Sequence, residues 1–248
     1  LKKMKKGILL CCHGSRNPGG INDTVQLLRF FKKKKNYTVK IGYLEILKPT
    51  IKDQLDFFFS KKFDYLLIVP AMLFSGNHVT KDIPKILNNL KKNYKTKPKV
   101  FINPPLLKSK KIFNVIQNNL IKSLKIIDKK KDGLIVVASR TINFKAKAEI
   151  SYLTKKIARK NKFNFYKEIL VTLNKKNLTK NLNKLNSKYN RFLVLPLFLF
   201  RGNLLENLRF AIKEINKQKK KKFILCSHLN DYKEIYNVIN KIIKYKTT

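Results

Sequence analysis

Short apolar runs alternate with longer amphipathic stretches along the whole chain. The apolar runs lie at residues 7–12, 39–44, 65–70 and 99–103 in the first half, and at 133–138, 166–171, 191–196 and 222–226 in the second. Runs of this length predict strands that are buried on both faces, with helices between them. In the first half the helices are expected at residues 20–35, 50–60, 79–93 and 109–127. The pattern predicts an α/β fold in which parallel sheets of about four strands are flanked by helices.

The second half of the chain repeats the first. Residues 66–77 (LLIVPAMLFSGN) align without gaps on residues 192–203 (FLVLPLFLFRGN), with six identities in twelve positions at an offset of 126. The same offset places the apolar run at 7–12 on the run at 133–138. One offset that recurs at separate places indicates an internal duplication. We therefore expect two tandem, similar lobes.

The boundary between the lobes is expected near residue 128. Close to the end of each half, residues 112–116 (IFNVI) match residues 235–239 (IYNVI) at an offset of 123. The polar stretch that follows the first half, KKKD before Gly133, is the expected linker. The expected lobes are 1–128 and 129–248, and because one chain supplies both of them we expect a monomer.

Three polar side chains follow three strands of the first lobe. His13 comes directly after the first strand, Glu45 after the second and His78 after the third. The carboxyl ends of parallel strands meet at one edge of a sheet, where folds of this kind bind ligands. The chain has only three histidines, so two of them at equivalent strand ends of one lobe indicate a shared site.

Two imidazoles and a carboxylate can support more than one chemistry. Neutral imidazoles bind divalent metals such as Co²⁺, Fe²⁺ and Zn²⁺, and they accept protons near neutral pH. A nearby carboxylate can orient a ligand or offset charge. The set could hold a catalytic zinc, as in metallohydrolases, or pass a metal to a porphyrin-like ring. The spacing alone leaves both possibilities open.

Three segments of the first lobe carry these residues. They are residues 7–17 (GILLCCHGSRN), 43–51 (YLEILKPTI) and 69–84 (VPAMLFSGNHVTKDIP). Together they resemble the sirohydrochlorin chelatases, the cobalt- or iron-inserting enzymes of cobalamin and sirohaem synthesis. The third segment, with Asp82 and Pro84 in the helix after the histidine, is the most specific. The resemblance covers nearly the whole chain, since longer family members are also two fused lobes.

The resemblance implies a chelatase-like fold and the roles of the three candidate residues. His13 and His78 would be the metal ligands, and Glu45 would assist proton removal. The metal, Co²⁺ or Fe²⁺, would be a substrate, and no organic cofactor or ATP is implied. The sequence has no GxxxxGK[ST] phosphate-binding loop that would contradict this. The choice between cobalt and iron, and between the cobalamin and sirohaem pathways, stays open.

A polycarboxylate tetrapyrrole requires cationic and hydrogen-bonding contacts. The candidates, expected around a cleft between the lobes, are Ser15, Arg16, Gly76, Asn77, Lys81, Arg140, Arg201 and Asn203. Capping of the next helix is an equally good interpretation of Ser15, and a solvated surface role is an equally good one of Lys81. Gly76 and Gly202 are expected to serve tight loops that need unusual backbone dihedrals.

The second lobe has lost both imidazoles. At the offset of 126, His13 falls on Ser139 and His78 falls on Leu204. We therefore expect one metal site, in the first lobe. The third histidine, His228, follows the last strand of the second lobe without a partner histidine, and its role stays open.

The positive charge of the chain is extreme. Lys and Arg number 57 against 14 Asp and Glu, which gives a formal net charge of +43. Lysine occurs in every segment and is accompanied by abundant Asn and Ile, a pattern typical of AT-biased coding. A nucleic-acid footprint instead concentrates its charge on one element. We expect no specific nucleic-acid partner, with charge-driven binding as an alternative.

The cysteine spacing and the hydropathy of the sequence indicate the cellular compartment. The three cysteines form neither a CxxC pair nor an even disulfide framework, which fits a reducing compartment. No apolar stretch approaches the roughly 20 residues of a membrane span, and no cleavable signal or membrane partner is expected. We expect a cytoplasmic protein, or a protein of the plastid stroma if it is organelle-encoded. Whether Leu1 is the true start stays open.

Two rivals stand beside the sirohydrochlorin chelatase. One is a chelatase that acts on another tetrapyrrole, such as protoporphyrin. The other is a non-catalytic carrier of metal or tetrapyrrole that keeps the histidines and forms no product. Multiple turnover with an acidic tetrapyrrole separates an enzyme from a carrier.

Overall fold

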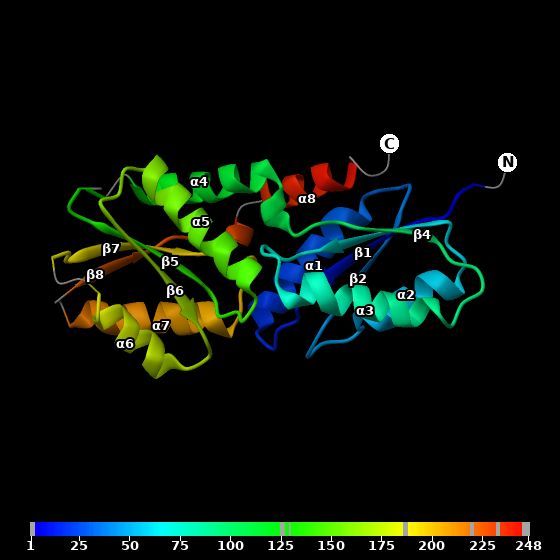
Figure 1. The fold of residues 1–248 in the computed structure, drawn as a ribbon, viewed down its shortest axis with the longest axis horizontal. Helices are drawn as coiled ribbons and strands as arrows, with labels where there is room; N and C mark the ends of the chain where they lie inside the picture. Colours follow the sequence, from blue (N-terminus) through cyan, green and yellow to red (C-terminus); the bar gives the residue numbers. More distant parts are fainter. Residues whose placement is uncertain are drawn as a thin grey trace. The chain divides into compact units, whose positions relative to one another are not determined.

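The computed structural model contains two four-stranded parallel sheets, one from each half of the sequence (Figure 1). It describes residues 3–124, 127–128, 130–185, 188–218, 221–231 and 234–244. The predicted α/β fold with two similar lobes is confirmed. Leu1 and the expected linker residue Lys129 lie outside the described residues, as do residues 125–126 of the expected helix at 109–127.

The first sheet has the strand order β2-β1-β3-β4. Its strands are β1 (Lys6–Cys12), β2 (Thr38–Tyr43), β3 (Tyr65–Pro70) and β4 (Lys99–Ile102). β1 is buried along almost its whole length, because it lies in the centre of the sheet with helices on both faces. The connection after β1 runs to one side of it, and the next connection brings β3 to the other side. The carboxyl ends of β1 and β3 therefore form a topological switch point, where open α/β sheets bind ligands.

The helices of the first half follow the strands as predicted. They are α1 (Pro18–Lys32), α2 (Ile51–Ser60), the π-helical turn η1 (His78–Asp82), α3 (Ile83–Lys91), the short η2 (Leu106–Lys108) and α4 (Lys110–Leu124). Local side chains fix their starts: the Asn17 side chain caps α1, and Thr50 and Asp53 form a capping box on α2. α2 and α3 pack on one face of the sheet, where Leu55 and Leu87 belong to the same apolar cluster as Leu9.

The second sheet repeats the topology of the first, in the order β6-β5-β7-β8. Its strands are β5 (Gly133–Ser139), β6 (Phe165–Val171), β7 (Arg191–Pro196) and β8 (Lys222–Leu225). The remaining helices are α5 (Phe144–Lys160), α6 (Lys175–Asn183), α7 (Asn203–Lys217), η3 (Leu229–Asp231) and α8 (Glu234–Lys244). α6 and α7 lie side by side on one face of this sheet and share its apolar core (Figure 1).

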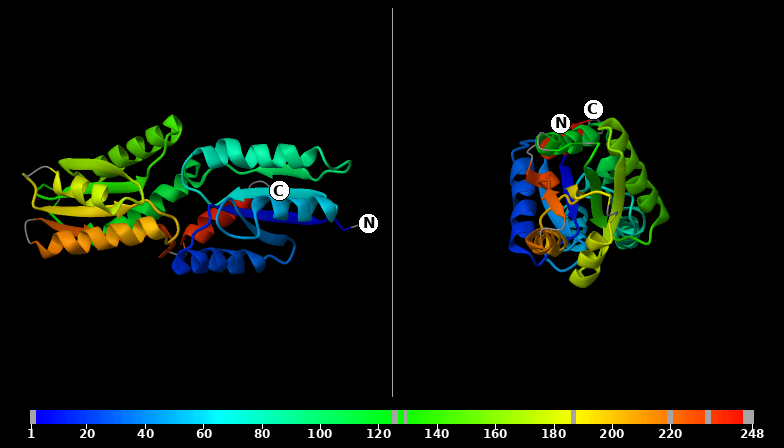
Figure 2. Two further views of the ribbon diagram at one scale, coloured as in Figure 1. Left: turned by 90° about the horizontal axis from the view of Figure 1, so that it is seen from below. Right: turned by 90° about the vertical axis from the view of Figure 1, so that its left-hand side faces the viewer.

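The packing units differ from the sequence halves in their last helices. Unit 1 comprises Leu1–Ile112 with Lys233–Thr248, and unit 2 comprises Phe113–Tyr232. Within unit 1, α8 lies on the same side of the sheet as α1 (Figure 2), and the rings of Phe30 and Tyr236 are 5.3 Å apart. Within unit 2, Gln117 of α4 and Asn161 beside α5 exchange amide hydrogen bonds. The expected lobes, 1–128 and 129–248, stay a prediction of the bounds of the repeat. The packing units differ from them because apolar periodicity does not show which sheet the last helix of each half covers.

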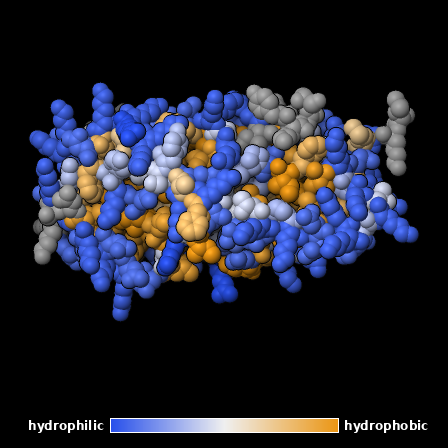
Figure 3. Space-filling model, viewed as in Figure 1, coloured by the Kyte–Doolittle hydropathy of each residue, from blue (hydrophilic) through white to orange (hydrophobic). Residues whose placement is uncertain are grey.

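Hydrophilic side chains are spread widely over the surface. On the face drawn in Figure 3 they cover most of the described surface, and apolar side chains show between them. This distribution is consistent with lysine that is dispersed through the sequence rather than gathered on one element. None of the helices in the described ranges is long and apolar enough to cross a bilayer.

All three cysteines are free and buried. Burial raises the pKa of Cys12 to about 12 and that of Cys226 to about 11, since an apolar interior disfavours the thiolate. We expect the native protein to react negligibly with a disulfide reagent such as DTNB at pH 8, and the protein unfolded in guanidinium to show three reactive thiols. A fast-reacting thiol in the native protein would contradict this burial.

Candidate metal site

Three side chains of unit 1 gather at the carboxyl edge of its sheet. His13 directly follows β1, Glu45 lies two residues beyond β2, and His78 opens the turn η1 after β3. One ligand atom from each residue lies within 4.8 Å of the other two. The distance from His13 Nε2 to Glu45 Oε2 is 3.9 Å, and the two imidazole centroids are 4.9 Å apart. The three candidates from the sequence thus share one place, at the switch point between β1 and β3.

The site is open to solvent. The side chains of His13, Glu45 and His78 are 50%, 54% and 35% exposed, respectively. A closed structural metal site is surrounded by four protein ligands, whereas a catalytic site keeps at least one position for water or substrate. Three potential ligands on an exposed edge fit the second kind. Such a site can take up a metal ion and release it.

Asp82 orients the imidazole of His78. Its Oδ2 lies 2.8 Å from His78 Nδ1, one turn further along η1. Because a carboxylate accepts a hydrogen bond, the proton of the neutral ring lies on Nδ1, and Nε2 keeps its lone pair for a metal. The sequence interpretation noted Asp82 only as part of a motif. The i,i+4 spacing of His78 and Asp82 was the signal for this contact.

The imidazole of His13 is oriented by the backbone of its own loop. His13 Nδ1 lies 3.2 Å from the carbonyl oxygen of Gly14, which can only accept. The ring proton therefore lies on Nδ1, as in His78, and Nε2 faces Glu45. In both histidines Nε2 is therefore the nitrogen that keeps its lone pair. This arrangement fits a divalent metal that is bound by two neutral imidazoles.

Gly14 brings the loops after β1 and β2 together. It has a φ of 100°, in the region that favours glycine. A Cβ at this position would lie 2.1 Å from the carbonyl oxygen of Glu45. The Glu45 N–H also donates to the carbonyl of His13 at 3.1 Å. Gly14 thus allows the close approach that places Glu45 beside His13.

The prediction that Gly76 and Gly202 need unusual dihedrals was wrong. Gly76 has no φ in the left-handed region, and a Cβ there would meet nothing within 4 Å. Its carbonyl instead accepts hydrogen bonds from Val79 and Thr80 at the start of η1. Gly202 has a φ of −179°, which is ordinary extended backbone. Among the glycines of the candidate loops, the positive φ occurs at Gly14, which the sequence interpretation did not single out.

The other candidates of unit 1 lie in the same two loops. Ser15 Oγ accepts from the backbone N–H of Asn17, and Asn17 itself caps α1, so the capping interpretation of Ser15 was wrong. Arg16 is exposed in the loop after β1, and Lys81 is exposed on η1. Asn77 is half-buried immediately before His78. Their contacts with a substrate stay a prediction, as does a cleft between the lobes.

Unit 2 lacks the candidate metal ligands at the corresponding strand ends. Ser139, the counterpart of His13, ends β5, and Leu204, the counterpart of His78, packs against the apolar core beneath α7. Among the described residues, His13, Glu45 and His78 are the one group of this kind with metal-binding geometry. Arg140 lines a pocket in unit 2. Arg201, which lies before α7, and Asn203, the first residue of α7, are outside that pocket. His228 is buried after β8.

Replacing Asp82 with asparagine should weaken Co²⁺ binding by roughly 10- to 100-fold, the usual effect of losing the partner of a metal-ligating histidine. The amide can donate to His78 Nδ1, which moves the ring proton to Nε2 and blocks the ligand position. Isothermal titration of the protein with Co²⁺ measures the change. Asp56→Asn, which removes a carboxylate that is bonded to Tyr94 instead, should bind Co²⁺ as tightly as the wild type. Equal affinities for the two variants would exclude this role of Asp82.

The fold and the site define a two-unit α/β protein of the chelatase type, with an open histidine–glutamate site in one unit. A family model described as CbiX matches residues 7–123 and 133–245, and the chain belongs to this family. The two matched segments correspond to the two halves of the repeat.

Relatives with assigned activities match both the whole chain and its parts. A sirohydrochlorin ferrochelatase of Priestia megaterium is 21% identical over 240 residues, which cover 96% of this chain and 89% of the relative. A sirohydrochlorin cobaltochelatase of Methanosarcina barkeri is 32% identical over 108 residues, which cover 40% of this chain and 83% of the relative. The shorter relative therefore corresponds to less than half of this chain.

Solved structures share the fold over the full length. The sirohydrochlorin chelatase SirB from Bacillus subtilis subspecies spizizenii, in complex with cobalt, has a TM-score of 0.76 at 16% identity and covers 97% of this chain and 94% of its own. A SirB structure from Bacillus subtilis with Fe³⁺ gives the same TM-score and identity and covers 97% of this chain and 95% of its own. These matches show that the two-unit fold is shared.

Proposed function

We propose that this protein inserts Co²⁺ or Fe²⁺ into sirohydrochlorin without ATP. The observation that carries the proposal is the cluster of His13, Glu45 and His78 at a switch point, with both Nε2 atoms free to bind a metal. Membership of the CbiX family supports it, as do the names of the relatives, which include both a ferrochelatase and a cobaltochelatase. The two metals have similar affinities for nitrogen and oxygen ligands, so the donor set accommodates either.

The proposed mechanism divides the site between two tasks. His13 and His78 hold the metal substrate through Nε2. Glu45, half-exposed beside His13, accepts a proton that a pyrrole nitrogen releases as the metal enters the ring. Each inserted divalent metal displaces two such protons, and solvent at this open edge takes them on from the carboxylate. Since the imidazoles must be neutral to bind, activity is expected to be lost in acid.

The test is an anaerobic absorbance time course of metal-free sirohydrochlorin with Co²⁺, and then with Fe²⁺, at a tenfold excess of ring over protein. We expect the protein to convert all of the ring faster than a protein-free control does. Conversion that stops at one equivalent would identify a carrier. Conversion of protoporphyrin but not of sirohydrochlorin would identify a chelatase for another ring. Each of these two results would overturn the proposal.

A further inference from the structure

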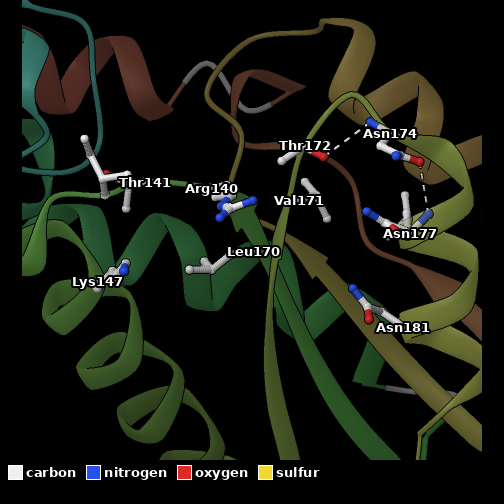
Figure 4. A pocket seen from close by; sticks show the side chains of 11 residues that line it. Arg140, Thr141, Lys147, Leu170, Val171, Thr172, Asn174, Asn177 and Asn181 are labelled. Atoms are coloured by element: carbon white, nitrogen blue, oxygen red, sulfur yellow. Dashed lines mark hydrogen bonds between the residues drawn. The ribbon is translucent and has the colours of Figure 1, made fainter.

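Unit 2 contains a pocket at the carboxyl edge of its own sheet. Its volume is about 370 Å³, and it lies between the ends of β5 and β6 and the first turns of α5 and α6 (Figure 4). By the repeat it corresponds to the edge that carries His13 and Glu45 in unit 1. The imidazole is replaced there by Ser139, and Arg140 follows. The second unit thus keeps a hollow at this edge and lines it with different chemistry.

The pocket is cationic. Arg140 and Lys147 line it, and none of the lining residues is acidic. The chain has only seven arginines. Two others in unit 2, Arg191 and Arg209, form ion pairs with Asp132 and Glu206, whereas the described part of the chain shows no ion pair to Arg140. A guanidinium that is held at a pocket without a carboxylate partner is suited to a two-pronged contact with an anionic ligand.

Local hydrogen bonds hold the segments that line the pocket. The N–H of Arg140 donates to the carbonyl of Val171 at 2.8 Å, which ties the end of β5 to the end of β6. The Asn174 side chain accepts from the N–H of Asn177 and caps α6. Asn177 and Asn181 line the pocket from this helix, opposite Lys147 on α5 (Figure 4). Their amide groups add hydrogen-bond donors beside Arg140.

Exposed apolar residues occur in the two chain segments that border the cationic pocket, and one of them, Ile142, lines it. Ile142 and Phe144 are 76% and 85% exposed in the segment that enters α5, and Leu173 is 63% exposed between β6 and α6. Lys147 Nζ lies 5.5 Å from the centre of the Phe144 ring. Ile142 and the Phe144 ring thus place apolar surface next to the cation of Lys147, as in a site for a ligand that is both apolar and charged. A small hydrated anion would not contact these apolar residues. A flat ring with carboxylates at its periphery could contact both the apolar residues and the cationic groups.

We propose that this pocket binds a peripheral carboxylate of the tetrapyrrole, with Arg140 as its main contact and Lys147 as the second. The inference rests on the proposed function for the identity of the ligand. It assigns the two units different tasks: unit 1 holds the metal, and unit 2 selects the ring by its acidic side chains. Lys147, Asn177 and Asn181 thereby join Arg140 as residues that determine substrate specificity.

The test is the affinity of the full chain for metal-free sirohydrochlorin, measured by titration of the ring's absorbance at fixed ionic strength. Arg140→Ala should weaken binding at least about 10-fold, the expected loss of a charge-assisted contact. Arg140→Lys keeps the positive charge but cannot make the two-pronged guanidinium contact. Its affinity for the ring should lie between that of Arg140→Ala and that of the wild type. The matched control is Arg159→Ala, which removes the same charge from the last turn of α5 and should change affinity less than about 2-fold. Equal losses in the two alanine variants would overturn the proposal.

Two further results separate this inference from the proposed function. If the wild type binds the ring in an Arg140-dependent manner but inserts no metal, the pocket assignment stands and the chelatase assignment fails. If the wild type inserts metal and Arg140→Ala leaves the ring affinity unchanged, the chelatase assignment stands and the pocket assignment fails. Citrate serves as a small carboxylate probe: Arg140-dependent binding of citrate without any effect of Arg140→Ala on the ring would make this a small-anion site and overturn the inference.

Discussion

Replacing His78 with alanine is expected to reduce metal insertion to the rate of the protein-free reaction, a loss of more than about 100-fold. Loss of a residue that is hydrogen-bonded to a metal ligand lowers metal affinity or activity by up to about 100-fold, so loss of the ligand itself should lower activity further. Unit 2 cannot compensate, because Leu204 occupies the corresponding position there. His13→Ala should have an effect of the same size, because the two imidazoles present equivalent nitrogens to one ion. The anaerobic absorbance assay with sirohydrochlorin measures both variants.

Lys85→Ala is the matched control for His78→Ala. Lys85 is an exposed residue of α3, seven positions further along the chain. Its replacement should leave the rate of insertion within about 2-fold of the wild type, as expected for a surface change. A His78→Ala variant that is folded and as fast as Lys85→Ala would refute the assignment of His78.

Replacing Gly14 with alanine is expected to destabilise unit 1 by at least about 2 kcal/mol and to abolish efficient insertion. A side chain at a φ of 100° is strained by roughly 1–2 kcal/mol. The added Cβ would also lie 2.1 Å from the Glu45 carbonyl oxygen, a backbone atom that cannot move without shifting the loop. The loop would have to retreat, and with it the carboxylate beside His13. Thermal unfolding followed by circular dichroism measures the loss of stability.

Gly76→Ala provides the contrast for Gly14→Ala. It adds the same methyl group to the loop before His78, but at a position with no atom within 4 Å and no left-handed φ. Its unfolding temperature should stay close to that of the wild type, while Gly14→Ala unfolds several degrees lower. Equal unfolding temperatures for the two variants would show that the close approach at Gly14 is not needed.

Much of the fold could be predicted from the sequence because buried parallel strands produce continuous apolar runs. Residues 7–12 and 133–138, for example, are buried on both faces and correspond to β1 and β5. The clustering of the candidate residues could be predicted because histidine is rare in this chain and follows two strands whose carboxyl ends must meet. Both inferences depend on information that is local in sequence.

The features that escaped prediction depend on contacts between distant segments. The need for glycine at position 14 arises from the carbonyl of Glu45, which belongs to another strand connection. The packing of α8 in unit 1 brings Tyr236 against Phe30, which lies in the other half of the sequence. The pocket of unit 2 needs two helices and two strand ends to be placed in space before Arg140 and Lys147 share a lining.

The two units carry different side chains at equivalent edges of a duplicated fold. Both sheets have the same strand order and the same kind of switch point. In unit 1 the strand ends carry imidazoles whose tautomers are fixed by Asp82 and by a backbone carbonyl. In unit 2 the corresponding edge carries a guanidinium and amides. The loss of His13 and His78 counterparts left the scaffold in place, because the apolar strand runs and not the loop residues hold each sheet together.

The most direct test of the metal site is X-ray absorption spectroscopy of the Co²⁺-loaded protein, with the His13→Ala, His78→Ala double variant as the comparison. We expect one bound cobalt per chain with two imidazole ligands in the wild type, and loss of both the imidazole signal and tight binding in the double variant. A wild-type spectrum without imidazole ligands, or an unchanged spectrum in the double variant, would place the metal elsewhere and refute the assignment of His13 and His78.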